Sequence, residues 1–304
     1  MPRRNLGPVS AVSSKTSEQP NRSFTVRLAQ VNPALGDVRR NLDMHLAHID
    51  AAVAERVQLI VFPELSLTGY YLRDLVPDVA LRLESPEVKS LAERSTKLSI
   101  VVGLVEETPD FDFHVAALYL EGGQVRHVHR KVYLPTYGMF DEERYYGVGD
   151  RIRAFDTGLG RCAMLICEDL WHPSAAYVAS RDRMQYLIAP SDSPVRGITS
   201  GKPEAADAYD AMLSTYARLF QVYVFFANRV GYEEGVSFWG GSQIIDPTGE
   251  TVAQAAYLEE AQLTATIDVG AVRRARARSP LLSDERMALT LRELQRIHRE
   301  DFED

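Results

Sequence analysis

The chain has 304 residues, 45% of them hydrophobic, with a formal net charge of −8 and a pI near 5.5. This length and apolar content suffice for one large domain with a sizeable core. The acidic balance argues against nucleic-acid binding, which needs a basic face, and no apolar run approaches the length of a membrane span.

The two cysteines, Cys162 and Cys167, are predicted to be free thiols. They lie five positions apart in one apolar run. On a strand, an odd separation puts side chains on opposite faces, so these two cannot form a disulfide. Free thiols are typical of a reducing compartment, and a cytoplasmic location is therefore expected.

Residues 1–22 are predicted to be a disordered tail. They are rich in Ser, Pro, Asn and Arg and include a single acidic residue, Glu18. The segment lacks both the apolar stretch of a secretory signal and the amphipathic pattern of a transit peptide. It offers too few apolar side chains to form part of a core.

The rest of the chain alternates between predicted strands and helices. Apolar or alternating runs predict strands at 24–31, 58–62, 100–105, 115–120, 124–129, 152–155, 161–166, 186–189, 222–226, 242–245, 251–255 and 263–267. Periodic apolar spacing predicts helices at 42–53, 86–98, 173–181, 202–221 and 285–300. Because hairpins occur beside helical crossovers, we expect an α/β fold with two mixed sheets and helices on their outer faces.

One stretch of the sequence echoes another. Residues 55–66 resemble residues 182–193 at an offset of 127 positions, far longer than the period of a solenoid. In both stretches a buried strand runs into a proline, Pro63 or Pro190, and then into polar residues. Two halves of similar build would explain the likeness, and so would chance similarity of helix and strand composition.

Three chemically useful side chains follow predicted strands. Glu64, Lys131 and Cys167 each come at the carboxyl end of a strand, where open sheets expose reactive groups. If those strands are neighbours, the three side chains converge. Taken one at a time, a surface glutamate, a solvated lysine and a core cysteine are the commoner readings.

Together the three residues would form a site for acyl transfer. A carboxylate such as Glu64 can take the proton of a thiol and return it to a leaving amine. The thiolate of Cys167 is the nucleophile. The ammonium of Lys131 can stabilise the thiolate and the oxyanion of a tetrahedral intermediate, and the backbone N–H of Glu168 is a second candidate oxyanion donor.

Three motifs containing these residues resemble the nitrilase superfamily of carbon–nitrogen hydrolases. The motifs are Phe62–Tyr70, Arg130–Pro135 and Leu165–Trp171, and the similarity runs from about Phe24 to Asp268. The resemblance implies a four-layer α-β-β-α sandwich, dimerised through helices, with a Glu-Lys-Cys triad.

The resemblance also implies a role for each catalytic residue. It makes Glu64 the base and acid, Lys131 the oxyanion stabiliser and Cys167 the nucleophile. An additional glutamate that positions the lysine and the substrate is placed at Glu142, with its neighbour Glu143 as the alternative.

Further residues are candidates for the substrate pocket. Ser191 and Ser193 follow a strand and line the pocket or form a plain turn. Tyr70 and Tyr137 bound the substrate or simply pack. Trp239 contributes an aromatic wall or leads into a strand. The histidines show no metal-binding spacing, and His127 and His129 are expected to be solvated.

Within the superfamily, the chain most resembles the glutaminase domain of glutamine-dependent NAD synthetase. Residues 30–37 and 134–142 contribute to this likeness. The sequence ends at Asp304 without a P-loop-like glycine motif, so coupling to NAD synthesis is not expected within it. Glu168 follows the nucleophile where true nitrilases usually have Trp, which favours amides over nitriles.

The leading hypothesis is a cofactor-free amidase with a small-molecule amide substrate that acts as a homodimer or higher homo-oligomer. The alternatives are a glutaminase subunit that supplies ammonia to a separate synthetase, and a non-catalytic binding or assembly protein. The expected domain boundaries are a tail at 1–22, the hydrolase domain at 23–270, and a charged helical extension at 271–304. The extension would pack on the domain or at a dimer interface.

Overall fold

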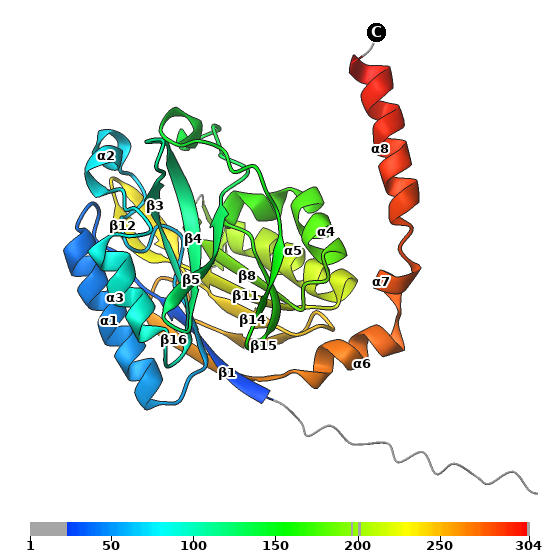
Figure 1. Ribbon diagram of the computed structural model, residues 1–304, viewed down its shortest axis with the longest axis horizontal. Coiled ribbons are helices and arrows are strands. Elements are labelled where there is room, and N and C mark those ends of the chain that lie inside the picture. The colour runs from blue at the N-terminus through cyan, green and yellow to red at the C-terminus, as the bar shows by residue number, and fades with distance from the viewer. Residues whose placement is uncertain (1–22, 196, 200–201, 303–304) are drawn as a thin grey trace, which may run out of the picture.

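The computed structural model describes residues 23–195, 197–199 and 202–302 and forms two packed mixed sheets flanked by helices (Figure 1). The tail predicted at 1–22 lies outside the described residues. The helices are α1 (Val38–Ala54), α2 (Val76–Val79), α3 (Pro86–Arg94), α4 (Pro173–Arg181), α5 (Glu204–Phe220), α6 (Gly270–Arg278), α7 (Leu281–Asp284) and α8 (Met287–Phe302). Short 3-10 turns lie at Arg73–Leu75, Glu142–Arg144 and Cys167–Trp171.

The first sheet has the strand order β16-β1-β2-β3-β4-β5. Its strands are β1 (Ser23–Gln30), β2 (Leu59–Val61), β3 (Ser99–Glu107), β4 (Phe113–Glu121), β5 (Gln124–Arg130) and β16 (Ala261–Asp268). The central strands β1, β2 and β3 are parallel, and the outer strands pair antiparallel. Since two antiparallel steps lead from β3 to β5, the carboxyl end of β5 lies at the same edge as that of β2.

The second sheet has the order β15-β14-β11-β8-β7-β6. Its strands are β6 (Ala154–Thr157), β7 (Gly160–Met164), β8 (Tyr186–Ser191), β11 (Tyr223–Asn228), β14 (Gln243–Ile245) and β15 (Thr251–Gln254). Here β7, β8 and β11 are parallel. Two small hairpins complete the fold, β9 (Ile198–Thr199) with β10 (Lys202–Pro203) and β12 (Val230–Glu233) with β13 (Val236–Trp239).

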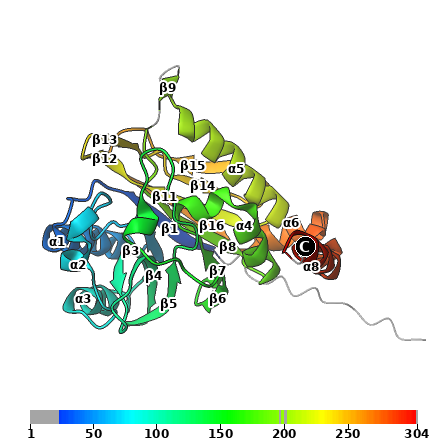
Figure 2. The ribbon, with the colours of Figure 1, turned by 90° about the horizontal axis from the view of Figure 1, so that it is seen from above.

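Alternation along the strands divides the core into three layers. On β3, Val101 faces the second sheet, whereas Val102 faces α1 and α3. On β8, Ile188 faces the first sheet and Leu187 faces α4 and α5. Both faces of each sheet are therefore apolar, and helices cover the outer ones (Figures 1 and 2). Burying one such aliphatic side chain contributes about 2 kcal/mol. The predicted α-β-β-α sandwich is confirmed.

The two echoing stretches of sequence have the same local structure. α1 leads into β2 and α4 leads into β8, and both strands lie between parallel neighbours. After each helix an arginine, Arg56 or Arg183, turns the chain with φ near +60° (+60° and +65°). A non-glycine residue in the left-handed region is uncommon, so its occurrence at both positions supports two halves of similar build.

The helices begin where local chemistry favours them. The Asp37 side chain caps α1 by accepting a 3.0 Å hydrogen bond from the N–H of Arg40. Pro86 and Pro173 occupy the first positions of α3 and α4, where their missing N–H groups cost nothing. α3 ends at Arg94, four residues before the predicted end at 98, although Leu98 is still buried.

The charged extension contains three helices, α6, α7 and α8. The last of them stands away from the body (Figure 1). Its first turn contacts the body where the Tyr177 hydroxyl of α4 lies 3.5 Å from Thr290 Oγ1. Met287, Leu291 and Leu294 on α8 are exposed.

Candidate active site

The ends of three strands meet at one place between the sheets. The strands themselves are not neighbours, because β3 and β4 separate β2 from β5 and Cys167 follows β7 in the other sheet. The three side chains therefore do not come together through neighbouring strands, which is the arrangement that the sequence pattern suggested. The side chains converge because β2 and β5 end at the same edge and the second sheet faces that edge.

Glu64 sits in a tight turn that is held from two sides. Its turn continues through Leu65, which has a φ of +43°. Gly103 of β3 packs directly beneath, where a Cβ would come within 2.5 Å of the Leu65 nitrogen. From α1, His45 Nε2 lies 3.0 Å from Ser66 Oγ. The turn therefore presents the carboxylate from a rigid support.

Lys131 lies fully buried between two carboxylates. Its Nζ donates to Glu64 Oε1 at 2.8 Å, and both oxygens of Glu142 lie 2.8 Å from Nζ. Burial lowers the pKa of Lys131, but the carboxylates of Glu142 and Glu64 more than offset this and hold that pKa well above its ordinary value. The lysine is therefore a fixed cation.

Of the two adjacent glutamates, Glu142 is the one beside Lys131. It is buried, whereas Glu143 is exposed. The Tyr70 hydroxyl donates to Glu142 Oε1 at 2.5 Å. Burial raises the pKa of Glu142 to about 7, with Lys131 opposing and Glu64 reinforcing the shift. The carboxylate thus changes charge in the neutral range.

Cys167 occupies a strained turn at the start of a 3-10 segment. Its φ of +44° is unusual for a residue with a side chain. The sulfur lies 3.6 Å from the Tyr209 hydroxyl, which also accepts a 3.2 Å hydrogen bond from the Trp171 indole. Burial first, and then the Glu64 carboxylate, raise the pKa of the thiol, whereas Lys131 lowers it. The resting sulfur is therefore a thiol that needs a base.

Asp169, which the sequence analysis missed, joins the lysine strand to the cysteine turn. Its Oδ1 accepts the N–H groups of Val132 and Tyr133, each at 3.0 Å. Its Oδ2 accepts from the Ile166 N–H at 2.9 Å and lies 2.8 Å from His129 Nε2. The expectation that His129 is solvated was wrong, because this buried carboxylate draws the ring into the core.

A cavity of about 280 Å³ opens onto Cys167. It is lined by Tyr137, Phe140, Cys167, Glu168, Trp171, Ser193, Pro194, Glu204, Ala205 and Tyr209. Of the pocket residues predicted from the sequence, Tyr137, Glu168 and Ser193 lie here, and the Tyr137 hydroxyl donates to Glu168 Oε2 at 2.9 Å. Ser191 lies buried at the end of β8, where its hydroxyl lowers the pKa of Cys167.

Trp239 does not form the predicted wall. Its side chain is fully buried and its indole N–H donates to Ser193 Oγ at 2.9 Å, so it supports the cavity from behind. The aromatic wall is made by other rings, those of Tyr137, Phe140, Trp171 and Tyr209. Trp171 belongs to the motif Leu165–Trp171, but the pattern of apolar and polar residues around it did not indicate that its ring faces the cavity.

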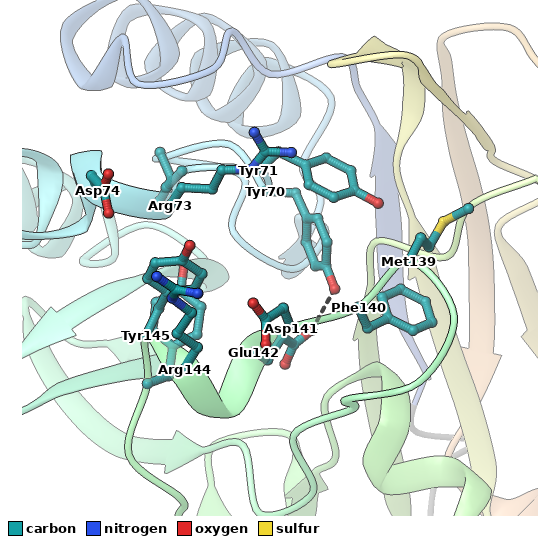
Figure 3. A pocket seen from close by; sticks show the side chains of 12 residues that line it. Tyr70, Tyr71, Arg73, Asp74, Met139, Phe140, Asp141, Glu142, Arg144 and Tyr145 are labelled. Atoms are coloured by element: carbon teal, nitrogen blue, oxygen red, sulfur yellow. Dashed lines mark hydrogen bonds between the residues drawn. The ribbon is translucent and has the colours of Figure 1, made fainter.

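A second cavity, of about 410 Å³, is also lined by Phe140 (Figure 3). Its lining includes Tyr70 and Glu142, with Tyr71, Tyr145 and other residues around them. Tyr70 therefore bounds this second cavity, and its hydroxyl points at Glu142.

No group of His, Cys, Asp and Glu side chains in the described part of the chain is arranged to hold a metal ion. Within the same residues, no helix combines the length and apolar character needed to cross a membrane.

Known proteins with similar sequences include carbon-nitrogen hydrolases. Residues 25–277 match the model of a family described as carbon-nitrogen hydrolase. A glutamine-dependent NAD(+) synthetase of Thermotoga maritima is 32% identical over 80% of this chain, and the match spans 42% of the synthetase. The chain therefore covers less than half the length of that relative.

Solved structures of other proteins have the same fold. A glutamine-dependent NAD+ synthetase from Acinetobacter baumannii superposes with a TM-score of 0.73 at 27% identity, covering 81% of this chain and 46% of that one. An amidase from Nesterenkonia sp. has a TM-score of 0.74 at 21% identity, covering 88% and 95%. At that identity the amidase shows the shared fold alone.

Proposed function

This chain belongs to the carbon–nitrogen hydrolase family, and from that premise we propose that it is an amidase whose nucleophile is Cys167. It hydrolyses a small-molecule amide through a thioester and releases ammonia or an amine. The observation that carries the proposal is the buried Lys131, held between Glu64 and Glu142 and electrostatically coupled to the Cys167 thiol beside a cavity.

In the proposed acylation, Glu64 takes the proton of the Cys167 thiol as the sulfur attacks the amide carbon. The resulting oxyanion is stabilised by the Lys131 ammonium and by the backbone N–H of Glu168. Glu64 then returns the proton to the amide nitrogen, the C–N bond breaks, and ammonia or an amine leaves. Glu142 holds the lysine in place throughout.

In the proposed deacylation, a water molecule attacks the thioester carbon while Glu64 accepts its proton. The second tetrahedral intermediate uses the same oxyanion donors. Its collapse releases the carboxylic acid, and Cys167 leaves as a thiolate that regains its proton from Glu64. Over the two steps the oxygen of water replaces the amide nitrogen on the acyl carbon, and no redox step is needed.

The test is a panel of primary amides assayed for ammonia release, combined with intact-mass measurement of trapped acyl adducts. Cys167→Ala is expected to abolish both signals, because the proposed thioester forms on the sulfur of this residue. Cys162→Ala is the matched control. That thiol lies in the core, where burial raises its pKa to about 12, and its removal should leave turnover intact.

Two results would refute the proposal. One is unchanged hydrolysis by folded Cys167→Ala. The other is a Cys167 inert to iodoacetamide in an inactive wild type, which would favour the non-catalytic alternative.

A glutaminase is the second candidate, and the relatives favour it. Several matched proteins are named glutamine-dependent NAD(+) synthetases, at 27–32% identity. In this version the amide is that of glutamine and the ammonia passes to a synthetase. Glutamine is therefore included in the panel. Hydrolysis of simple amides with no turnover of glutamine, alone or with a synthetase partner, would exclude it.

A further inference from the structure

A buried cation that takes no part in the proposed reaction lies behind the catalytic carboxylates. Arg229 follows β11 and has no exposed surface. Its Nη1 lies 2.8 Å from Glu233 Oε2 and 3.9 Å from Asp192 Oδ2. Its guanidinium lies 4.1 Å from the centre of the Phe238 ring. We call Asp192, Arg229 and Glu233 the Arg229 cluster.

One arm of the Arg229 cluster reaches Glu142. The Oε1 atom of Glu233 accepts the backbone N–H groups of Tyr70 and Tyr71, at 2.9 and 2.5 Å. The Tyr70 hydroxyl in turn donates to Glu142 Oε1, the atom that also accepts from Lys131 (Figure 3 shows the Tyr70 bond). Through Glu233, Arg229 is therefore linked to the backbone of Tyr70, whose hydroxyl contacts Glu142.

The other arm reaches Glu64. The backbone N–H of Arg229 donates to the Ser191 carbonyl at 3.1 Å. The next residue, Asp192, donates its own N–H to Glu64 Oε2 at 3.0 Å. The oxygen of Glu64 that does not face Lys131 is thus held by Asp192, whose own carboxyl lies 3.9 Å from the Arg229 guanidinium.

From these two arms we propose that Arg229 is a positioning residue that holds both carboxylates in register with Lys131. The proposal rests on the proposed function, because it concerns the same reaction. Arg229 acts through Glu233 and Asp192 and contacts no substrate.

The charge balance of the region supports this role. The carboxyls of Glu64, Glu142, Asp192 and Glu233 are all buried here. Burial holds the pKa of Asp192 well above its ordinary value, and Arg229 is the strongest group acting in the opposite direction. Removing one partner from a buried ionic cluster leaves an uncompensated charge, and the cluster then rearranges.

The decisive variant is Arg229→Met, which keeps an unbranched apolar stem and removes the charged guanidinium. A misplacement of about 1 Å can cost on the order of 10²-fold in rate, so we expect kcat to fall by about that factor while KM changes by less than about threefold. Arg229→Lys restores a cation without the fork and should recover part of kcat.

Arg27→Met is the matched control. Arg27 is also buried and ion-paired, with Glu55, but it lies on the outer face of the first sheet beneath α1. The Arg27→Met variant should have a lower melting temperature and an unchanged kcat per folded molecule. If Arg229→Met does not fold, Glu233→Gln carries the test, because it keeps the acceptor for Tyr70 and Tyr71 and removes the charge that faces Arg229.

A second measurement does not need the substrate. The rate of Cys167 alkylation by iodoacetamide at pH 7 depends on the base being in place, so it should fall in Arg229→Met and not in Arg27→Met. Turnover and alkylation at wild-type rates in folded Arg229→Met would overturn the positioning role and leave the amidase proposal standing. If the wild type turns over no amide but Arg229→Met still slows alkylation, the amidase proposal is overturned and the positioning role of Arg229 stands.

Discussion

At the scale of single residues, the site is governed by which carboxylates surround Lys131. Glu142 and Glu143 are adjacent in sequence and alike in chemistry, so the sequence could not separate them. The 3-10 turn at Glu142–Arg144 decides, because it points the first glutamate inward and the second toward solvent. That choice has a consequence for pH.

We expect kcat/KM to decline as the pH drops below about 7. Burial raises the pKa of Glu142 to about 7, so its negative charge beside Lys131 is present above that pH and lost below it. Pre-steady-state or steady-state rates from pH 5 to 9 would report this acid limb. Glu142→Gln should lower the rate and remove the limb, whereas Glu143→Gln should retain both. A Glu142→Gln profile superimposable on the wild type would contradict the assignment.

The sequence pattern singled out Glu64, Lys131 and Cys167, which lie together in the structure, but not the residues that support them. Glu64, Lys131 and Cys167 each follow a recognisable strand. Asp169 and Arg229 also follow strands, but their sequence surroundings gave no hint that both would be buried among backbone N–H groups and other charges. Their roles depend on contacts between segments far apart in the chain, which no local pattern encodes.

At the scale of secondary-structure elements, β3 forms the floor beneath the Glu64 turn. Gly103 is the point of contact, and a Cβ there would lie 2.5 Å from the Leu65 nitrogen and 2.6 Å from the Pro63 carbonyl oxygen. Both atoms belong to the backbone, which cannot yield without moving the turn.

Gly103→Ala should therefore displace Glu64. Overpacking of this kind costs about 1–3 kcal/mol, and we expect a lower melting temperature together with at least about a tenfold loss of kcat, since positioning errors are costly. Gly158→Ala is the control, because its nearest neighbour is the movable carboxylate of Glu121. Full activity in Gly103→Ala would show that the turn tolerates the shift.

The helix α1 also supports the Glu64 turn, through His45. Burial lowers the pKa of this histidine to about 4, while its ring bonds the Asn41 carbonyl at 2.6 Å and Ser66 Oγ at 3.0 Å. The folded state therefore holds the ring neutral at pH values where the unfolded chain already protonates it.

This depressed pKa gives a stability that is present above about pH 6.5 and is lost as the pH falls toward 4. The full effect would be on the order of 3 kcal/mol. Urea unfolding at pH 7.5 and pH 4.5 should show a smaller acid loss for His45→Gln than for the wild type. His298→Gln, on the exposed α8, should behave as the wild type does. Equal losses in all three proteins would disprove the role of His45.

Most elements could be predicted because their apolar patterns are strong. The hairpin β12–β13 was missed. Its strands have only four residues each, and Tyr232 in β12 and Glu234 in the turn are exposed, so no clear apolar alternation marks the hairpin. That hairpin buries Phe238 and Trp239 and carries Glu233, and without it the sequence could not decide between the two alternatives for Trp239.

At the scale of the whole molecule, the helix α8 is the feature that the single chain leaves incomplete. Its apolar side chains Met287, Leu291 and Leu294 recur at helical spacing, and all three are exposed. Val178 on α4 and Leu219 on α5 are exposed on the body as well. A two-fold pair would bury the same apolar surfaces on both copies.

We therefore expect a homodimer in which α8 of one copy packs on the other. Light scattering coupled to size exclusion should give twice the chain mass. Leu291→Glu combined with Leu294→Glu should yield monomers, and Arg292→Glu, on a neighbouring face of the helix, should not. A wild type that remains monomeric at high concentration would disprove this assembly.

The overall architecture could be predicted as two mixed sheets, since hairpin and crossover signals were both visible. The relative positions of the strands that precede Glu64, Lys131 and Cys167 could not be predicted. Whether β2 and β5 are adjacent depends on the pairing of β3 and β4 between them, and the facing of β7 depends on packing across the interior.

The division of the catalytic groups between the sheets has a consequence for how the protein reaches its active form. Glu64, proposed as both acid and base, and Lys131 follow strands of the first sheet, and Cys167 follows a strand of the second. A nascent or refolding chain with only one layer formed would be chemically silent. The rate at which thiol reactivity returns during renaturation would therefore report the rate at which the two sheets pack together, the last step in forming the active site.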